Sequence, residues 1–231
     1  MHRLLRPFAS TIRLVGEPPE GESFDFQCAL RSLPGILGST LEAIPSAIPY
    51  LIPEAPLADE WRQRIGDHGL KIGICWQGAP FPKVDRGRSV PLRRFHPIAI
   101  LPGVRLLSIQ KNHGLDQLSE LPSGMMVETL GAEFDIGRDA FVDAAAVMSC
   151  LDLIVTSDTS IAHLAGALGR PVWVVLKHVP DWRWMLDRSD SPWYPTVKLY
   201  RQSVRDDWDG VFERVAEDVA KLTATKGDGA E

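Results

Sequence analysis

The 231-residue chain has little of what marks membrane-spanning, disulfide-rich or nucleic-acid-binding proteins. No apolar run approaches the roughly 20 residues that a transmembrane helix needs. Three cysteines, far apart and without CxxC spacing, argue against a disulfide framework or a zinc site and predict reduced, buried thiols. The net charge of −5 argues against a general nucleic-acid binder, because such proteins are usually basic. The opening MHRLLRPFAS lacks the long apolar region of a signal peptide, so we expect a cytoplasmic protein.

From about residue 70 onward, short apolar β-type runs alternate with helical patterns. This alternation predicts an α/β fold with a doubly wound parallel sheet. The predicted strands cover 71–76, 104–109, 126–130, 153–155, 172–176 and 197–200. The predicted helices cover 92–101, 115–121, 139–151, 159–168 and 208–222. Asp139 is the expected N-cap of its helix, and Asp206 and Asp207 are expected to cap the last one.

The first 60 residues have a different composition. Residues 24–30 could form one strand, and the prolines between residues 34 and 56 predict an extended connector with short helical turns. This stretch has too few elements to form a domain of its own.

The most informative segment is 152–176, DLIVTSDTSIAHLAGALGRPVWVVL, which predicts a strand, a polar turn, a helix and a second strand. The turn lies at the carboxyl end of a strand, where open α/β sheets bind ligands, and a helix N-terminus favours an anion such as a diphosphate. Thr159 and Ser160 would hold a phosphate, and Asp158 or His163 would bond sugar hydroxyls. The alternative is that Asp158 only caps the helix and His163 is a hydrogen-bonded core residue.

Two other loops follow predicted strands at the same edge of the sheet. In the first, Gly78 would let the backbone approach a ligand, and three basic residues could pair with phosphate oxygens, namely Lys83, Arg86 and Arg88. An ordinary solvated basic loop is the alternative. In the second, Gln110 could bond a nucleobase or ribose and Lys111 a phosphate, although a polar loop start is the simpler interpretation of this pair alone.

A third loop region is rich in tryptophan, with Trp182, Trp184 and Trp193 inside twelve residues. Their rings could stack on a base or a sugar, or could pack an irregular segment against the sheet. We favour packing for Trp184 and leave the other two open. In the packing interpretation, Arg183 would form an ion pair with Asp187.

The motifs WQG…DRGRS, SIQK, DLIVTSDTSIAHLAGALGRPVWVV, PDWRWML, SPWYP and DWDGVFERV resemble, in this order, a known family. It is the glycosyltransferase module found behind tetratricopeptide repeats in many bacterial proteins, which is similar to the heptosyltransferase-like (family 9) enzymes of the GT-B fold. The resemblance covers residues 24–222 and implies transfer of a sugar from a nucleotide-diphosphate donor to an acceptor hydroxyl, without a metal or other cofactor. It implies donor binding by Gly78, Lys83, Arg86, Gln110, Lys111, Asp158, Thr159, Ser160 and His163.

The resemblance also implies a division of the chain. Residues 1–62 would be a remnant of the acceptor-side domain with its connector, 63–222 the nucleotide-sugar-binding Rossmann-like domain, and 223–231 a flexible tail. The glycine-rich front motif of the family, near its catalytic base, has no counterpart in residues 1–26. We therefore expect a truncated module with an unknown catalytic residue, whose incomplete domain a partner chain could cover. A non-catalytic nucleotide-sugar-binding or interaction module is the alternative, and a nucleotide-sugar epimerase is a weaker third hypothesis.

Overall fold

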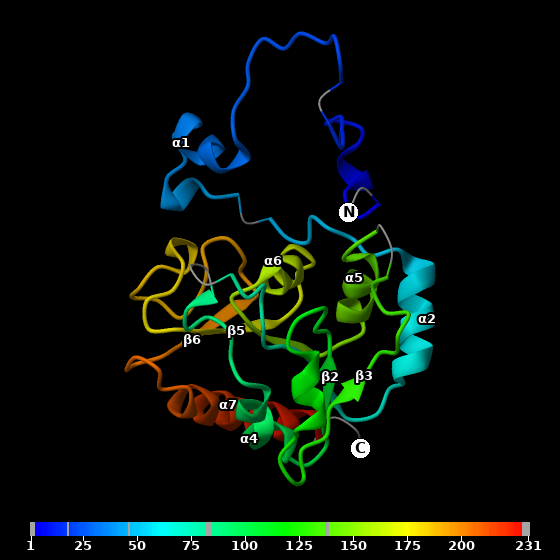
Figure 1. Ribbon diagram of the computed structural model, residues 1–231, viewed down its shortest axis with the longest axis vertical. Coiled ribbons are helices and arrows are strands. Elements are labelled where there is room, and N and C mark those ends of the chain that lie inside the picture. The colour runs from blue at the N-terminus through cyan, green and yellow to red at the C-terminus, as the bar shows by residue number, and fades with distance from the viewer. Residues whose placement is uncertain (1–2, 18, 46, 82–84, 137–138, 228–231) are drawn as a thin grey trace.

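A six-stranded sheet with the order β3-β2-β1-β4-β5-β6 forms the centre of the protein, seen in a computed structural model (Figure 1). The structure describes residues 3–17, 19–45, 47–81, 85–136 and 139–227. Every neighbouring pair of strands is parallel, which confirms the predicted doubly wound α/β fold. The strands are Leu70–Cys75 (β1), Val104–Ser108 (β2), Glu128–Thr129 (β3), Leu153–Ser157 (β4), Val172–Leu176 (β5) and Val197–Arg201 (β6).

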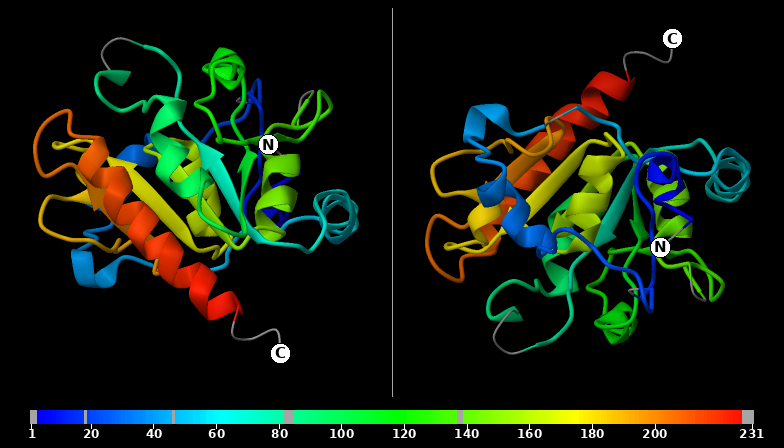
Figure 2. Two further views of the ribbon diagram at one scale, coloured as in Figure 1. Left: turned by 90° about the horizontal axis from the view of Figure 1, so that it is seen from below. Right: turned by 90° about the horizontal axis from the view of Figure 1, so that it is seen from above.

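Helices cover both faces of this sheet, and for that reason the central strands are buried on both sides (Figure 2). Every residue of β1 and of β4 is buried, as expected for parallel strands that read as continuous apolar runs. One face carries α2 (Ala55–Ile65), α5 (Val142–Ser149) and α6 (Ser160–Ala167). The other carries the 3-10 turn η4 (Leu92–Phe95), the short α4 (His96–Ala99) and the long α7 (Asp209–Gly227).

Two helices differ from the predicted ones. Helix α5 begins at Val142 after Phe141, which is in the left-handed conformation, so Asp139 is not its N-cap; Asp139 instead pairs with Arg3 at 3.2 Å. The predicted helix 92–101 is divided into η4 and α4, because Pro97 has no N–H to continue the hydrogen-bond ladder.

At the carboxyl end, α7 is longer than predicted. It continues to Gly227, five residues into the segment predicted to be a flexible tail. Asp207 caps it as predicted, since its Oδ1 accepts the Gly210 N–H at 2.9 Å. Asp206 does not cap it: this residue has a φ of 66° and its N–H donates to Gln202 instead.

The amino-terminal segment forms no strand at residues 24–30. The side chain of Phe26 is 94% exposed and Cys28 is also exposed, so the predicted strand and the predicted burial of this thiol are both wrong. Cys75 and Cys150 are free and buried, as predicted. A strand needs a neighbour for its backbone groups, and residues 24–30 pair with no strand in the described part of the chain.

The connector that follows carries the predicted short turns η2 (Leu30–Ser32), α1 (Leu33–Ile36) and η3 (Leu41–Ala43), after η1 (Arg6–Phe8) near the amino terminus. It lies on the α6 side of the sheet in Figure 1. The predicted boundary after residue 62 falls inside α2, which packs on α5 through the Trp61 Nε1–H bond to Asp143 Oδ1, 3.0 Å long. None of the helices in the described ranges combines the length and the apolar composition of a membrane-spanning segment.

Candidate functional site

Two clefts open where the carboxyl ends of β1, β2, β4 and β5 meet, the usual ligand position in such sheets. The β4–β5 cleft has a volume of about 710 Å³ and is lined by Arg88, Asp158, Thr159, Ser160, His163, Lys177, Pro180, Asp181 and Arg183. The β1–β2 cleft, of about 410 Å³, has a polar lining that includes Gln77, Gln110, Lys111, His113 and Asp135, and Gly78 also lines it. Thr159 and Ser160 line both clefts and therefore join them.

The turn before α6 presents its polar groups to the β4–β5 cleft. Thr159 is the N-cap, because its Oγ1 accepts the Ile161 N–H at 3.3 Å and its backbone is extended. Asp158, which the alternative interpretation made the cap, does not have this role, and its carboxylate makes no hydrogen bond within the described residues. Since Ser160 is the exposed first residue of α6, the N-terminal end of this helix, with its positive dipole end, lies at the junction of the two clefts.

His163 lies on the next turn of α6 in an aromatic environment. Its ring stacks on that of Trp184 with centroids 5.2 Å apart, and its Nδ1 lies 3.2 Å from the Tyr194 hydroxyl. Burial lowers the pKa of His163, so the imidazole is neutral at pH 7. With Nδ1 at the Tyr194 hydroxyl, the neutral imidazole has one uncharged nitrogen, Nε2, left for a ligand, which suits a sugar hydroxyl better than a phosphate.

Arg88 is the cation that the structure places most firmly in the β4–β5 cleft. Its side chain is 17% exposed, and its Nη2 donates to the Ala79 carbonyl at 3.2 Å. A Cβ at position 78 would lie 2.3 Å from Nη2, so Gly78 makes room for this guanidinium. The family resemblance does not imply donor binding by Arg88, although its position in a basic loop after a strand pointed to phosphate binding.

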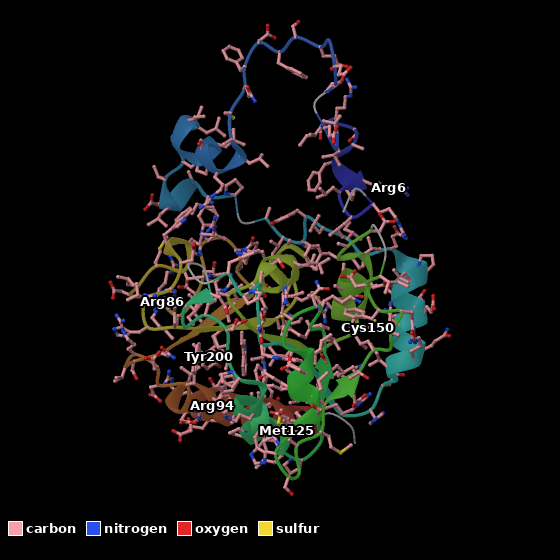
Figure 3. The ribbon with its side chains drawn as sticks, viewed as in Figure 1. Arg6, Arg86, Arg94, Met125, Cys150 and Tyr200 are labelled. Carbon is pink, nitrogen blue, oxygen red and sulfur yellow. The ribbon has the colours of Figure 1, made fainter. Side chains whose placement is uncertain are left out.

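Arg86, in the same loop, does not line the β4–β5 cleft. Arg86 is exposed and lines a separate cavity beside the β4–β5 cleft, on the side where Figure 3 labels it. Gly87 between the two arginines has a φ of 67°, and this backbone reversal directs Arg86 and Arg88 to different cavities. Lys83 lies outside the described residues, so its donor-binding role stays a prediction.

Both polar atoms of the Gln110 side-chain amide form hydrogen bonds, and these bonds join two loops. Its Oε1 accepts the N–H groups of Trp76 and Gln77, at 2.9 and 3.0 Å. Its Nε2 donates to the carbonyls of Gln77 and His113, at 2.7 and 2.9 Å. The side chain is buried, so the contacts indicate a structural role at the floor of the β1–β2 cleft, and the contact with a nucleobase stays a prediction.

The far wall of the β1–β2 cleft contains a group that the sequence did not reveal. Asp135 has a φ of 51°, its Oδ1 is buried without a hydrogen-bond partner in the described structure, and burial raises its pKa. Lys111, a predicted site residue, lies beside it, with its Nζ donating to the Phe134 carbonyl. A strained backbone and an unpaired carboxylate oxygen at a cleft are typical of functional positions. No motif marks Asp135, because β3 ends six residues earlier.

In the tryptophan-rich loop, Trp184 packs in the core, as predicted. Trp184 is fully buried, whereas Trp182 is 59% exposed and meets Trp193 edge to face, with centroids 6.0 Å apart. Arg183 pairs with Asp181 at 2.7 Å, not with Asp187 as predicted. The reason is local: Asp181 caps the 3-10 turn Trp182–Trp184 (η6), and its Oδ1 already accepts the Arg183 N–H.

In the described ranges, no group of three or more His, Cys, Asp or Glu side chains is arranged to hold a metal ion.

Comparison with known proteins relates this edge of the sheet to sugar-transferring enzymes. Residues 102–176, which include β2 to β5 and the turn before α6, match the family model Glycosyltransferase family 9 (heptosyltransferase). Protein FlbA of Caulobacter vibrioides is 25% identical over 220 residues, which are 93% of this chain and 36% of FlbA.

Two solved structures share the fold. The ADP-heptose lps heptosyltransferase II of E. coli superposes with a TM-score of 0.59 and 17% identity, over 82% of this chain and 58% of that one. A family 9 glycosyl transferase from Veillonella parvula gives a TM-score of 0.52 and 16% identity, over 76% of this chain and 52% of that one. The chain thus has the GT-B-type fold of glycosyltransferases, and it spans about a third of FlbA and somewhat over half of the heptosyltransferase.

Proposed function

We propose that this chain binds a nucleoside-diphosphate sugar across its two clefts and takes part in transferring the sugar to an acceptor hydroxyl. The observation that carries the proposal is that Thr159 and Ser160, at the start of α6, line both clefts. A diphosphate at this junction would direct the nucleoside into one cleft and the sugar into the other. The family 9 match, which includes this turn, supports the same function.

The diphosphate would be held by fixed positive groups. The N–H groups at the start of α6 carry partial positive charge, and the β4–β5 cleft adds the Arg88 guanidinium and the Lys177 ammonium. The same groups would stabilise the negative charge that develops when the nucleoside diphosphate leaves. This arrangement needs no metal ion.

The sugar would lie in the β4–β5 cleft beside Asp158 and His163. A carboxylate repels a diphosphate but accepts hydrogen bonds from hydroxyls. Neutral His163 has its Nε2 left to donate to or accept from a hydroxyl, since Nδ1 meets the Tyr194 hydroxyl. The nucleoside would lie in the β1–β2 cleft, where the unpaired Asp135 Oδ1 is an acceptor for a ribose hydroxyl. Transfer also requires a base for the acceptor proton, and we assign that role to no residue of this chain.

Replacing Arg88 with glutamine is expected to weaken nucleoside-diphosphate binding about tenfold, because a charge-assisted hydrogen bond contributes roughly 1.5–3 kcal/mol. Calorimetric titration of the chain with UDP, ADP and GDP would measure this loss and identify the base that is bound. The control is Arg62→Gln on α2, which removes an exposed arginine far from both clefts. Equal affinity of the Arg88→Gln variant and the control, or no nucleotide binding by the folded chain, would contradict the proposal.

The substitution Asp158→Asn distinguishes contacts with the sugar from contacts with the diphosphate. We expect this variant to bind the nucleotide sugar about fivefold more weakly, because an amide oxygen is a weaker acceptor than a carboxylate for hydroxyl protons. Binding of the sugar-free nucleoside diphosphate should stay unchanged or become tighter, since a nearby negative charge is removed. Parallel titrations with the two ligands test this, and an equal loss for both would mean that Asp158 does not contact the sugar.

A further inference from the structure

A third cavity, of about 260 Å³, lies at the carboxyl ends of β5 and β6, next to the β4–β5 cleft. We call it the β5–β6 cavity, and its polar lining consists of Arg86, Lys177, His178, Gln202, Arg205 and Asp206. Lys177 lines both this cavity and the β4–β5 cleft, so the two are neighbours. Figure 3 shows Arg86 on the side of the molecule that carries these two strands.

The cavity has an excess of positive charge. Arg86, Lys177 and Arg205 contribute three cations against the one carboxylate of Asp206. Arg86 and Arg205 form no ion pair in the part of the chain that the structure describes, and the Lys177 ammonium donates only to the Arg86 carbonyl, at 3.0 Å. Cationic side chains that converge on a small hollow without carboxylate partners attract anions.

Gln202 adds a hydrogen-bond donor that the described protein leaves unused. The residue is 2% exposed, and its Oε1 accepts the N–H groups of His178 and Asp206, both at 3.1 Å. These two bonds fix the orientation of the amide. Its Nε2 is buried and has no acceptor within the described residues. Because buried donors without partners are rare, this amide is a group of the lining residues whose hydrogen-bonding capacity the described protein does not use.

We infer that the β5–β6 cavity binds an oxyanion, a carboxylate or phosphate group, that the acceptor carries. The acceptor part of this inference rests on the proposed function. The cavity adjoins the cleft assigned to the sugar and is separate from the cleft assigned to the nucleoside, so an acidic group bound there would lie beside the donor sugar. The acceptor would then be an acidic molecule, and Arg86 would contact the acceptor rather than the donor.

The test is a titration of the chain with inorganic phosphate, and separately with malonate, in the presence of a saturating nucleoside diphosphate. The signal is the NMR shift of the Gln202 side-chain amide, which reports on this cavity. We expect a shift with at least one anion. The Arg205→Gln substitution should lower the affinity for that anion at least fivefold without changing the affinity for the nucleotide. Arg205 is exposed, so this variant should fold normally. A phosphate response alone would assign a phosphorylated acceptor, and a malonate response alone a carboxylated one.

The matched control is Arg88→Gln, which should lower the affinity for the nucleotide and leave the affinity for the anion unchanged. An anion affinity unchanged by Arg205→Gln, or displacement of the anion by the nucleotide, would overturn the inference. Arg205-dependent anion binding by a chain that binds no nucleoside diphosphate would retain the anion site but overturn both the acceptor assignment and the proposed function.

Discussion

Replacing Gln110 with alanine is expected to lower the free energy of unfolding by about 3 kcal/mol. The substitution removes the acceptor of the Trp76 and Gln77 N–H groups and the donor to two carbonyls, in a part of the protein with little access to water. Leaving a buried polar group without a partner costs roughly 1–3 kcal/mol, and several groups are affected here. The shift of the midpoint of urea-induced unfolding measures the loss.

The control for this substitution is Gln63→Ala on the exposed face of α2, which should change stability by less than about 0.5 kcal/mol. The Gln110→Ala variant should also bind nucleoside diphosphates more weakly, because the loops after β1 and β2 lose the amide that joins them. If the two variants unfold at the same urea concentration, Gln110 does not brace the loops, and a ligand contact becomes the better account of this residue.

Replacing Gly166 with alanine should have a comparable effect through packing. A Cβ at this position in α6 would lie 2.4 Å from Cγ of Tyr194, so the ring must move. Forcing an additional methyl group into a packed core costs roughly 1–3 kcal/mol. Because the Tyr194 hydroxyl lies 3.2 Å from His163 Nδ1, the movement should also displace His163 and weaken nucleotide-sugar binding.

Thermal unfolding and nucleotide-sugar titration would measure the two effects. Gly35→Ala in α1 is the matched control, since a Cβ there meets no atom within 4 Å and the helix gains a better helix former. A Gly166→Ala variant that is as stable as this control would show that the Tyr194 ring does not lie against α6.

The sheet could be predicted from the sequence because its central strands are buried on both faces. A strand such as β4 then appears as a continuous apolar run, and the glycine and proline after α6 mark the next boundary. Residues 24–30, FDFQCAL, also have strand-forming apolar residues but form no strand. Whether such a run becomes a strand depends on a neighbour with free backbone groups, and the local sequence does not contain that information.

The sequence identified the loops that form the candidate site but not the role of each side chain in them. Asp158, Thr159 and Ser160 are all good cap residues, so composition does not select Thr159; the backbone angle at each position does. The sequence does not distinguish Arg86 from Arg88, but the positive φ of Gly87 directs their side chains to different cavities. Asp135 could not be found at all, because its importance comes from burial and from a missing partner.

The strand order has a consequence for how this protein folds. In the central pair of the sheet, Ile72 of β1 lies opposite Leu153 of β4, so β2, β3 and α5 are all synthesised between two strands that must meet. Closing so long a loop costs entropy before the pairing returns any stability, which makes this step slow compared with local helix formation. The clefts lie on either side of the same join. Nucleotide binding would therefore report on completed assembly, and a chain that stalls before β4 docks would have helices but no binding site.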